Sequence, residues 1–315
     1  MTPLPEPIAL QIAAWLASGE IDLFIGYEAG TVPLHATPAF LRKPEEVSRL
    51  IWDATCETNL TAYLKNLRGK KVGLMIKGCD ARAIVGLIQE RQWQRENLRL
   101  VGVNCPGVVD RLAVARHLGI GVEEIADASL EGEKVRVGEI TLPFDEVLYP
   151  MCRDCTMHAP ILYDLLMGPE VESTFQGDPF AHVREMEALS PDERWARFTE
   201  EIAPCTLCLA CRNACPLCYC AVCFVERTMP AWFTPTTAPE DIQFYQIVRT
   251  FHLAGRCVGC GACTRACPMG IDLRLFLDKL RLDTLELFGY EAGVSVEARP
   301  PLTTYREEDP NDFIL

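Results

Sequence analysis

Eight cysteines between residues 205 and 267 repeat one spacing pattern twice, and this spacing is typical of iron-sulfur proteins. Each copy reads C-x2-C-x2-C-x3-C with a proline after the last cysteine. In two-cluster bacterial ferredoxins, three cysteines of each copy bind one [4Fe-4S] cluster and the fourth binds the other cluster. The spacing therefore predicts two clusters, with the ligands Cys205, Cys208, Cys211 and Cys267 for cluster 1 and Cys257, Cys260, Cys263 and Cys215 for cluster 2.

Two other uses of these eight cysteines fit the pattern less well. A zinc site takes four ligands, usually from paired C-x2-C elements, so a structural zinc protein is the weakest alternative. Disulfides form in oxidising compartments, and the amino terminus reads as an amphipathic helix rather than an export signal. The sixteen cysteines of the chain therefore indicate metal binding in a reducing, anaerobic cytoplasm.

Four further cysteines fall where they can converge on a third [4Fe-4S] cluster. Cys79 and Cys105 follow two apolar runs, 71–77 and 98–104, that read as strands separated by a helix. Such a βαβ unit makes the strands parallel, and open α/β sheets bind ligands beyond the carboxyl ends of their strands. Cys152 and Cys155 add a C-x2-C pair. The alternative is that all four are buried as small apolar side chains, which is common for free cysteine.

The remaining cysteines are assigned no cluster of their own. Cys218 and Cys220 are separated by a single residue, a poor spacing for a cubane, so we expect packing or supporting roles for Cys218, Cys220 and Cys223. Cys56 is an alternative ligand to one of the four cysteines of cluster 3.

Hydrophobic periodicity predicts the elements that position these cysteines. In the first half we expect helices over 45–52, 59–67, 81–92, 107–118 and 160–167, with Asp80 as the N-cap of the third and short strands over 123–148. In the second half, Ser190 and Glu193 form a capping box that opens a helix leading to Cys205. Two amphipathic helices follow. The first, over 239–253, has Phe244, Ile247, Val248 and Phe251 on one face, and the second, over 272–288, turns Leu273, Phe276, Leu277 and Leu280 inward. Their apolar faces are candidate contacts for a partner, although the core of the cassette needs most of that surface.

Composition limits the classes of partner. A chain of 315 residues with 49% hydrophobic residues is long enough for about two globular domains. Its net charge of −14 argues against binding to nucleic acid or to anionic membrane surfaces. We expect no membrane span, because no stretch approaches the roughly twenty apolar residues that a span requires.

Three segments of the first half resemble the coenzyme F-420 hydrogenase/dehydrogenase beta-subunit family. They are Lys77-Gly-Cys-Asp-Ala-Arg-Ala83, the turn from Val103 to Gly107, and Cys152-Arg-Asp-Cys-Thr156. The resemblance covers about residues 20 to 168, and a ferredoxin cassette often accompanies this family. It implies a flavoprotein that transfers electrons between bound FAD and iron-sulfur clusters. It also matches Cys79, Cys105, Cys152 and Cys155 to the cysteines of the family's own [4Fe-4S] cluster.

The residues that would contact the flavin are less well defined. Lys77, Arg82 and Arg153 flank the predicted third cluster and could contact phosphate or ring oxygens, whereas the alternative is that they form ordinary salt bridges. No G-x-G-x-x-G follows a strand, so the sequence shows no Rossmann NAD site, and it identifies no catalytic residue.

With the resemblance, the predicted fold is an α/β (α+β) flavin and iron-sulfur domain followed by a helix-flanked bacterial dicluster ferredoxin domain. The first domain covers residues 1–168, and a linker with an entry helix follows over residues 169–203. The ferredoxin domain covers residues 204–289, and residues 290–315 form a tail. The leading hypothesis is an electron-transfer subunit that exchanges electrons between a soluble carrier, FAD, the clusters and a partner subunit. By resemblance the partner is of hydrogenase, formate dehydrogenase or heterodisulfide-reductase-like type. The competing hypothesis is a flavin-free, polyferredoxin-like adaptor between two enzymes.

Overall fold

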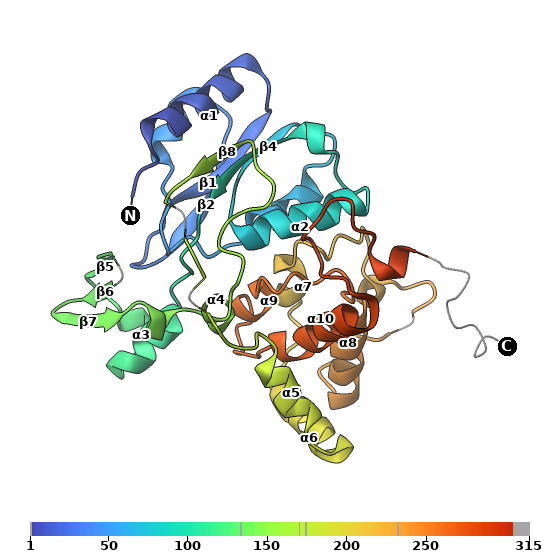
Figure 1. The fold of residues 1–315 in the computed structure, drawn as a ribbon. Helices are drawn as coiled ribbons and strands as arrows, with labels where there is room; N and C mark the ends of the chain where they lie inside the picture. The colour runs from blue at the N-terminus through green and yellow to red at the C-terminus, as the bar shows by residue number, and fades with distance from the viewer. Residues whose placement is uncertain (1, 133, 170, 174, 232, 305–315) are drawn as a thin grey trace. The chain divides into compact units, whose positions relative to one another are not determined.

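Figure 1 shows the computed structural model, which describes residues 2–132, 134–169, 171–173, 175–231 and 233–304. The chain divides into two compact units. The first comprises Met1–Arg82 with Trp93–Pro179, and the second comprises Ala83–Gln92 with Phe180–Leu315. Residues 305–315 of the predicted tail lie outside the described residues. Within the described ranges, no helix has the length and apolar character needed to cross a bilayer.

A five-stranded mixed sheet forms the centre of the first unit. Its order is β2-β1-β3-β4-β8, and the strands are β1 Leu23–Ala29, β2 Ala36–Leu41, β3 Val72–Ile76, β4 Leu98–Val103 and β8 Leu165–Met167. Strands β1, β3, β4 and β8 are parallel, and β2 pairs antiparallel with β1 at the edge. The predicted parallel pairing of the two strands that precede Cys79 and Cys105 is therefore confirmed.

The burial of β3 explains why its sequence reads as an unbroken apolar run. All five of its residues are buried, as is usual for a central parallel strand with both faces covered. Helix α1, Glu6–Ser18, buries Ile12, Trp15 and Leu16, as its amphipathic pattern predicts. Helix α2, Gly78–Gln89, begins in the first unit, and its later turns belong to the second.

Asp80 has a different place from the one predicted. Helix α2 begins at Gly78, so Asp80 is its third residue rather than its N-cap. The Asp80 Oδ2 atom accepts a hydrogen bond from the backbone N–H of Lys77 at 3.0 Å. Because a capping box contains this same backward bond, Asp80 still satisfies a free donor at the start of the helix.

A small antiparallel meander and one helix form a second core in the first unit. The strands β5 Ala128–Leu130, β6 Lys134–Val137 and β7 Ile140–Pro143 confirm the short strands predicted there. Helix α3, Arg111–Leu118, starts at Asp110, whose Oδ1 accepts from the Leu112 N–H at 2.9 Å, and ends at the left-handed Gly119. Val114, Val135 and Val147 pack together in this core.

Helices and connecting loops make up the second unit apart from the end of α2. They are α5 Ala181–Glu187, α6 Pro191–Ile202, α7 Ala210–Ala214, α8 Pro239–Phe251, α9 Ala262–Arg265 and α10 Arg274–Phe288. The capping box of Ser190 and Glu193 is present at the start of α6, and its last residue, Ile202, is buried beside the start of the cysteine motif.

Three predicted helices have other structures. Residues 160–167 are not a helix, because Leu165–Met167 pair with β4 as the last strand of the sheet. The helices expected over 45–52 and 59–67 are 3₁₀ segments, Pro44–Arg49 and Leu60–Asn66. Further short segments are α4 Pro150–Arg153 and 3₁₀ turns at Arg95–Asn97, Val122–Glu124, Asp145–Val147, Phe224–Glu226 and Pro301–Thr303.

The buried face of α8 also differs from the prediction. Phe244 and Phe251, which belong to the predicted apolar face, are 45% and 62% exposed. The buried residues of α8 are Ile242, Tyr245, Gln246 and Arg249. In α10 the expected burial of Leu273 and Leu277 is confirmed.

Candidate iron-sulfur sites

Four cysteines from the two motif copies line one pocket in the second unit. They are Cys215 from the first copy and Cys257, Cys260 and Cys263 from the second. This is the ligand set that the sequence predicts for cluster 2. The backbone curls around the pocket because Gly259 and Gly261 have φ angles of 69° and 66°, a left-handed conformation that suits glycine.

The protonation of these thiols indicates what the pocket can hold. Burial raises the pKa of Cys257 strongly and that of Cys263 to about 11, although Arg281 and Arg249 oppose these increases. At neutral pH the free thiols would therefore be protonated. Iron ligation requires thiolates, so a bound group must supply positive charge to the sulfurs. The iron atoms of a cubane do so, and the donor set fits a [4Fe-4S] cluster.

The first motif copy adopts the same left-handed backbone conformation at two equivalent positions, although neither residue there is glycine. Leu207 and Leu209 adopt φ angles of 52° and 61° at the positions equivalent to Gly259 and Gly261. The short helix α7 that follows packs against α9 of the other copy. The two copies therefore form a paired structure like the one that shared cluster ligands require.

The cysteines predicted for cluster 1 are placed less uniformly. Cys205 follows the end of α6, and its Sγ lies 3.5 Å from Gln246 Nε2. Cys211 is buried and interacts electrostatically with Cys205. Cys208 is exposed, and Cys267 is half-buried after α9. Ligation of cluster 1 by all four remains a prediction.

In the first unit, the structure brings together Cys105, Cys152 and Cys155. Burial raises the pKa of Cys105 to about 12, and the neighbouring Cys152 and Cys155 contribute to this increase. The segment around His158 fixes the position of Cys105, because the Cys105 N–H donates to the His158 carbonyl at 2.9 Å and His158 Nδ1 lies 2.8 Å from the Cys105 carbonyl.

Gly78, the residue before Cys79, packs closely against the loop at Met157. A Cβ atom at Gly78 would collide with the carbonyl oxygen of Met157, so only glycine lets the start of α2 approach this loop closely. Cys79 interacts with Lys77, which also interacts with Cys105. Cys79 and Cys105 thus share Lys77 as a neighbour, and cluster 3 remains a prediction.

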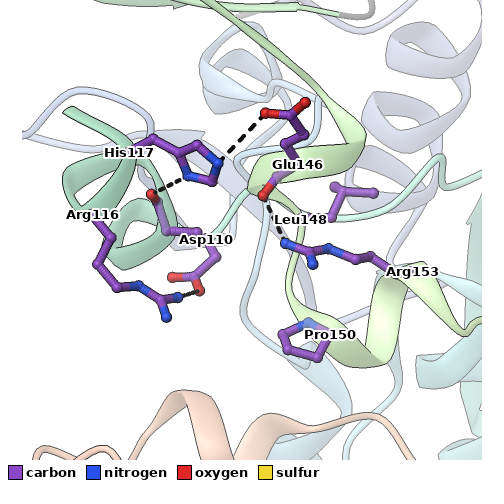
Figure 2. Close-up of a pocket in the computed structure, with 8 residues that line it drawn as sticks. Asp110, Arg116, His117, Glu146, Leu148, Pro150 and Arg153 are labelled. Carbon is purple, nitrogen blue, oxygen red and sulfur yellow. Dashed lines mark hydrogen bonds and ion pairs between the residues drawn. The ribbon is translucent and has the colours of Figure 1, made fainter.

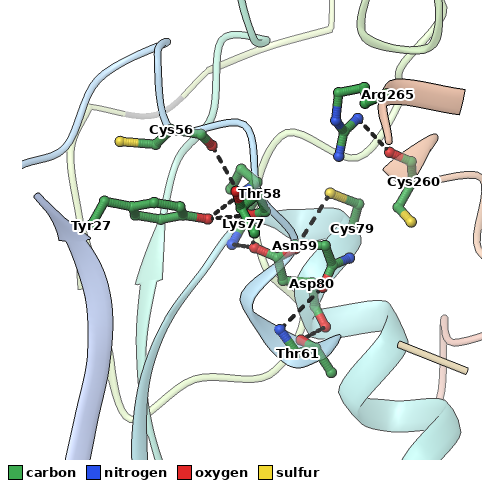
Figure 3. Close-up of polar contacts among 10 residues, drawn as sticks. All are labelled: Tyr27, Cys56, Thr58, Asn59, Thr61, Lys77, Cys79, Asp80, Cys260 and Arg265. Atoms are coloured by element: carbon green, nitrogen blue, oxygen red, sulfur yellow. Dashed lines mark hydrogen bonds and ion pairs between the residues drawn. The ribbon is translucent and has the colours of Figure 1, made fainter. Parts of the chain in front are cut away.

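Lys77 is the centre of a buried polar network (Figure 3). Its side chain is 2% exposed, and its Nζ bonds the carbonyl oxygens of Thr58 at 2.9 Å and Cys56 at 3.1 Å, the Tyr27 hydroxyl, and Asp80 Oδ2 at 3.1 Å. Burial alone would lower the pKa of Lys77, but Asp80 and Tyr27 outweigh it and raise that pKa. The ammonium is therefore charged and fully engaged with protein acceptors.

Cys56 lies next to this network. It is completely buried, its carbonyl accepts from Lys77, and it interacts electrostatically with Cys105. Burial raises the pKa of its thiol strongly. Both the alternative ligand role and a packing role for Cys56 remain open at this position.

A polar pocket of about 500 Å³ lies elsewhere in the first unit (Figure 2). Arg116, His117 and Arg153 line it together with Asp110 and Glu146. Arg153 Nη2 donates to the Glu146 carbonyl at 2.7 Å, Arg116 pairs with Asp110 at 3.4 Å, and His117 lies 3.5 Å from Glu146. Two arginines and two carboxylates therefore line the pocket, so its polar lining carries both signs of charge.

The three residues predicted to contact flavin do not meet in this pocket. Arg153 lines it, whereas Lys77 and Arg82 are buried away from solvent. Sequence reasoning missed Arg116 and His117, which lie in the last turn of α3 and belong to no motif. It also missed Tyr245, Gln246 and Arg249 on α8, because their burial contradicts the apolar pattern of that helix.

The three extra cysteines of the loop after the first motif copy lie near its ligands. Cys218 hydrogen-bonds Cys215, which lowers the pKa of Cys218, and it also interacts with Cys223. Cys220 is exposed. The supporting role predicted for Cys218 thus has a physical basis, because a hydrogen bond to a ligand sulfur changes its electron density.

This chain is similar to known proteins over nearly its whole length. It is 22% identical to the F420-dependent formate dehydrogenase subunit beta of Methanocaldococcus jannaschii over 346 residues, covering 90% of this chain and 89% of that protein. It is also 22% identical to the F420-dependent formate dehydrogenase 1 subunit beta of Methanococcus maripaludis over 356 residues, covering 91% and 90% of the two chains. No family model matches the sequence.

A solved structure of the F420-reducing [NiFe] hydrogenase complex from Methanosarcina barkeri has a chain with a TM-score of 0.39 and 15% identity, covering 64% of this chain and 90% of that one. A score this low carries no argument about function. The similarity to the two relatives extends over both units and agrees with the three family motifs of the first. The chain is therefore similar over nearly its whole length to beta subunits of F420-dependent formate dehydrogenases, in agreement with the coenzyme F-420 hydrogenase/dehydrogenase beta-subunit family that its first half resembles.

Proposed function

We propose that this chain is the electron-transfer subunit of an anaerobic, multi-subunit oxidoreductase. The observation that carries the proposal is the single pocket lined by Cys215, Cys257, Cys260 and Cys263, in a chain similar over nearly its full length to two dehydrogenase subunits. When bound, FAD supplies two-electron hydride chemistry and [4Fe-4S] clusters supply one-electron transfer.

The cysteines hold iron as thiolates, so cluster assembly releases the protons that burial keeps on Cys257 and Cys263. The left-handed turns at Gly259 and Gly261 let successive sulfurs point into one pocket. The partly buried Arg281, whose side chain is 18% exposed, lies beside Cys257 and limits the cost of the negative charge there. These residues bind and tune the clusters.

For FAD we propose Arg153 as the contact among the three predicted residues, supported by Arg116 in the same pocket. Guanidinium groups bind phosphate oxygens well, and both line an open polar pocket. Lys77 would instead fix the end of β3, because its donors are taken by protein oxygens.

The names of the relatives favour one set of partners. Both are subunits of F420-dependent formate dehydrogenases, so we propose coenzyme F-420 as the soluble carrier and a formate dehydrogenase subunit as the preferred partner. Partner subunits of hydrogenase or heterodisulfide-reductase-like type are the remaining candidates of the same class.

The test is the metal and flavin content of protein purified without oxygen. Three cubanes give about twelve iron atoms per chain, together with one released flavin. About eight iron atoms would remove cluster 3, and about sixteen would make ligands of Cys56, Cys218, Cys220 and Cys223. Full iron without flavin would support the flavin-free adaptor, and a colourless, zinc-containing protein would overturn the proposal.

A further inference from the structure

The buried face of α8 is polar, which is unusual for a helix inside a small unit. Tyr245, Gln246 and Arg249 are only 1%, 2% and 2% exposed, whereas the apolar Phe244 and Phe251 on the same helix are largely exposed. Burying an amide or a guanidinium costs free energy unless partners compensate for it. The partners of these three side chains therefore determine which face of α8 turns inward.

Two of the partners are sulfurs predicted to bind cluster 1. Gln246 Nε2 donates toward Cys205 Sγ at 3.5 Å, and the Tyr245 hydroxyl lies 3.8 Å from Cys211 Sγ. Hydrogen bonds to ligand sulfurs draw electron density from them and thereby change the potential of a cluster.

Arg249 contacts cysteines of both predicted clusters. Its Nη2 donates to the Cys211 carbonyl at 3.2 Å. The same guanidinium interacts electrostatically with Cys263, Cys211 and Cys215. One buried cation therefore lies among the ligands of both sets.

Within the described residues, Arg249 has no carboxylate partner, and its Nε and Nη1 make no hydrogen bond. Arg281, by contrast, bonds Asp278 Oδ1 at 2.6 Å. A buried charge without a counter-charge is strongly destabilising unless opposite charge lies nearby. A thiolate-ligated cubane carries about two negative charges when oxidised and one more when reduced, which supplies that opposite charge.

We infer that the polar face of α8, formed by Tyr245, Gln246 and Arg249, raises the reduction potentials of the two ferredoxin-type clusters. The inference rests on the proposed function. Reduction adds negative charge to a cluster, so a nearby cation and donors to its sulfurs stabilise the reduced form more than the oxidised form. The three are positioning residues, because they act through the cysteine sulfurs and the charge of the clusters.

The test is a redox titration of the anaerobic holoprotein, followed by electron paramagnetic resonance, for the wild type and four variants. Arg249→Gln removes the charge and should move both midpoint potentials to more negative values. Arg249→Lys keeps the charge but loses the planar fork, so its shift should be smaller. Tyr245→Phe should lower only the potential of cluster 1. Arg197→Gln removes an equal charge from the exposed part of α6 and is the matched control, with no shift expected.

The outcomes separate this inference from the proposed function. Wild-type protein without iron would refute the proposed function and the inference together. Two clusters whose potentials are unchanged in Arg249→Gln and Tyr245→Phe would overturn the inference alone. If Arg249→Gln fails to hold iron, Tyr245→Phe decides, because it preserves most of the side-chain volume, and an unchanged potential of cluster 1 in it would overturn the inference.

Discussion

The ion pair of Lys77 and Asp80 shows how much one buried contact can contribute at the scale of single residues. Both side chains are almost completely buried, and their atoms lie 3.1 Å apart. Asp80 also accepts the Lys77 N–H, so it fixes both the backbone and the side chain at the junction of β3 and α2. This junction positions Cys79, which follows two residues after Lys77.

Asp80→Asn should therefore destabilise the protein by about 3–5 kcal/mol, because it leaves the Lys77 ammonium buried without its counter-charge. Chemical denaturation monitored by circular dichroism measures the change. The matched control is Glu131→Gln, which breaks the exposed pair with Arg136 and should have little effect. If Asp80→Asn lowered the free energy of unfolding as little as the control does, the buried pair would not be stabilising.

The same variant should change the pH dependence of stability. In the wild type, the folded-state pKa of Lys77 lies above its usual value of 10.5, so the pair contributes fully below pH 10.5 and is lost only as pH rises through the folded pKa. Without Asp80, burial should lower the pKa of Lys77 below the unfolded value. The unfolded state of the variant then binds more protons than its folded state. The difference in unfolding free energy between variant and wild type should therefore narrow as the pH rises toward the unfolded pKa of Lys77.

Cys79→Ser tests the predicted third cluster. Serine should abolish ligation there and reduce the iron content by about four atoms per chain. The resonance signals of the two ferredoxin-type clusters should persist, because their predicted ligands all lie in the second unit. Cys220→Ser, which alters an exposed cysteine outside the three predicted sets, is the control and should keep all the iron. Loss of the ferredoxin-type signals with survival of the third would show that the cysteines are assigned to the wrong clusters.

At the scale of elements, the two cysteine motifs have one backbone course with different residues. Leucines in the first copy adopt the left-handed conformation that glycines adopt in the second. A non-glycine residue in this conformation costs roughly 1–2 kcal/mol. Local preference therefore does not explain the left-handed conformation of these leucines, and we attribute it to the directions in which the neighbouring cysteines must point.

Gly261→Ala should cost about 1–2 kcal/mol from the left-handed backbone alone, and it should also lower retention of cluster 2. Gly289→Ala is the matched control, since Gly289 has a φ of 60° at the end of α10 and open space around it. Both variants should lose similar thermal stability, but only Gly261→Ala should lose iron on gel filtration under chelator. Equal iron retention would mean that the turn at Gly261 does not position the ligands.

The sequence predicted elements well where apolar pattern and burial coincide. Strands β3 and β4 are unbroken apolar runs at the centre of a sheet, so their parallel pairing followed from the helix between them. The prediction failed over 160–167 because Leu165–Met167 gain hydrogen bonds from β4, a partner distant in sequence. It did not predict the buried polar residues of α8, because Gln246 contacts Cys205, a residue distant in sequence.

In the candidate sites too, the contacts between residues distant in sequence were not predicted. Cysteine spacing predicted the set around the cluster 2 pocket, since four ligands of one cube must follow its geometry. The polar pocket with Arg116 and His117 has no spacing rule, because it arises from packing of α3 against the segment around Glu146. Buried polar residues such as Arg249 become recognisable only once the surrounding thiols are in place.

At the scale of the whole molecule, the chain resembles a component of a larger assembly. Its net charge is −14, and each bound cubane would add about two negative charges. Exposed apolar side chains nevertheless occur on two helices of the second unit, with Phe251 62%, Leu287 73% and Phe288 59% exposed. Where such side chains gather in one patch, they mark a contact with a partner, and we expect these three to form such a contact surface.

We expect a formate dehydrogenase subunit to cover this surface, because a chain that transfers electrons needs an acceptor and both relatives are named as subunits of that enzyme. Native purification on an affinity tag, without oxygen and at low salt, should recover that partner at equal stoichiometry. Phe251→Ser and Leu287→Ser should each reduce the recovered partner severalfold, since each removes apolar area from the contact. Leu10→Ser, which alters an equally exposed leucine on α1, should leave recovery unchanged. Recovery of a monomer that alone couples reduced coenzyme F-420 to a terminal acceptor would refute the expected assembly.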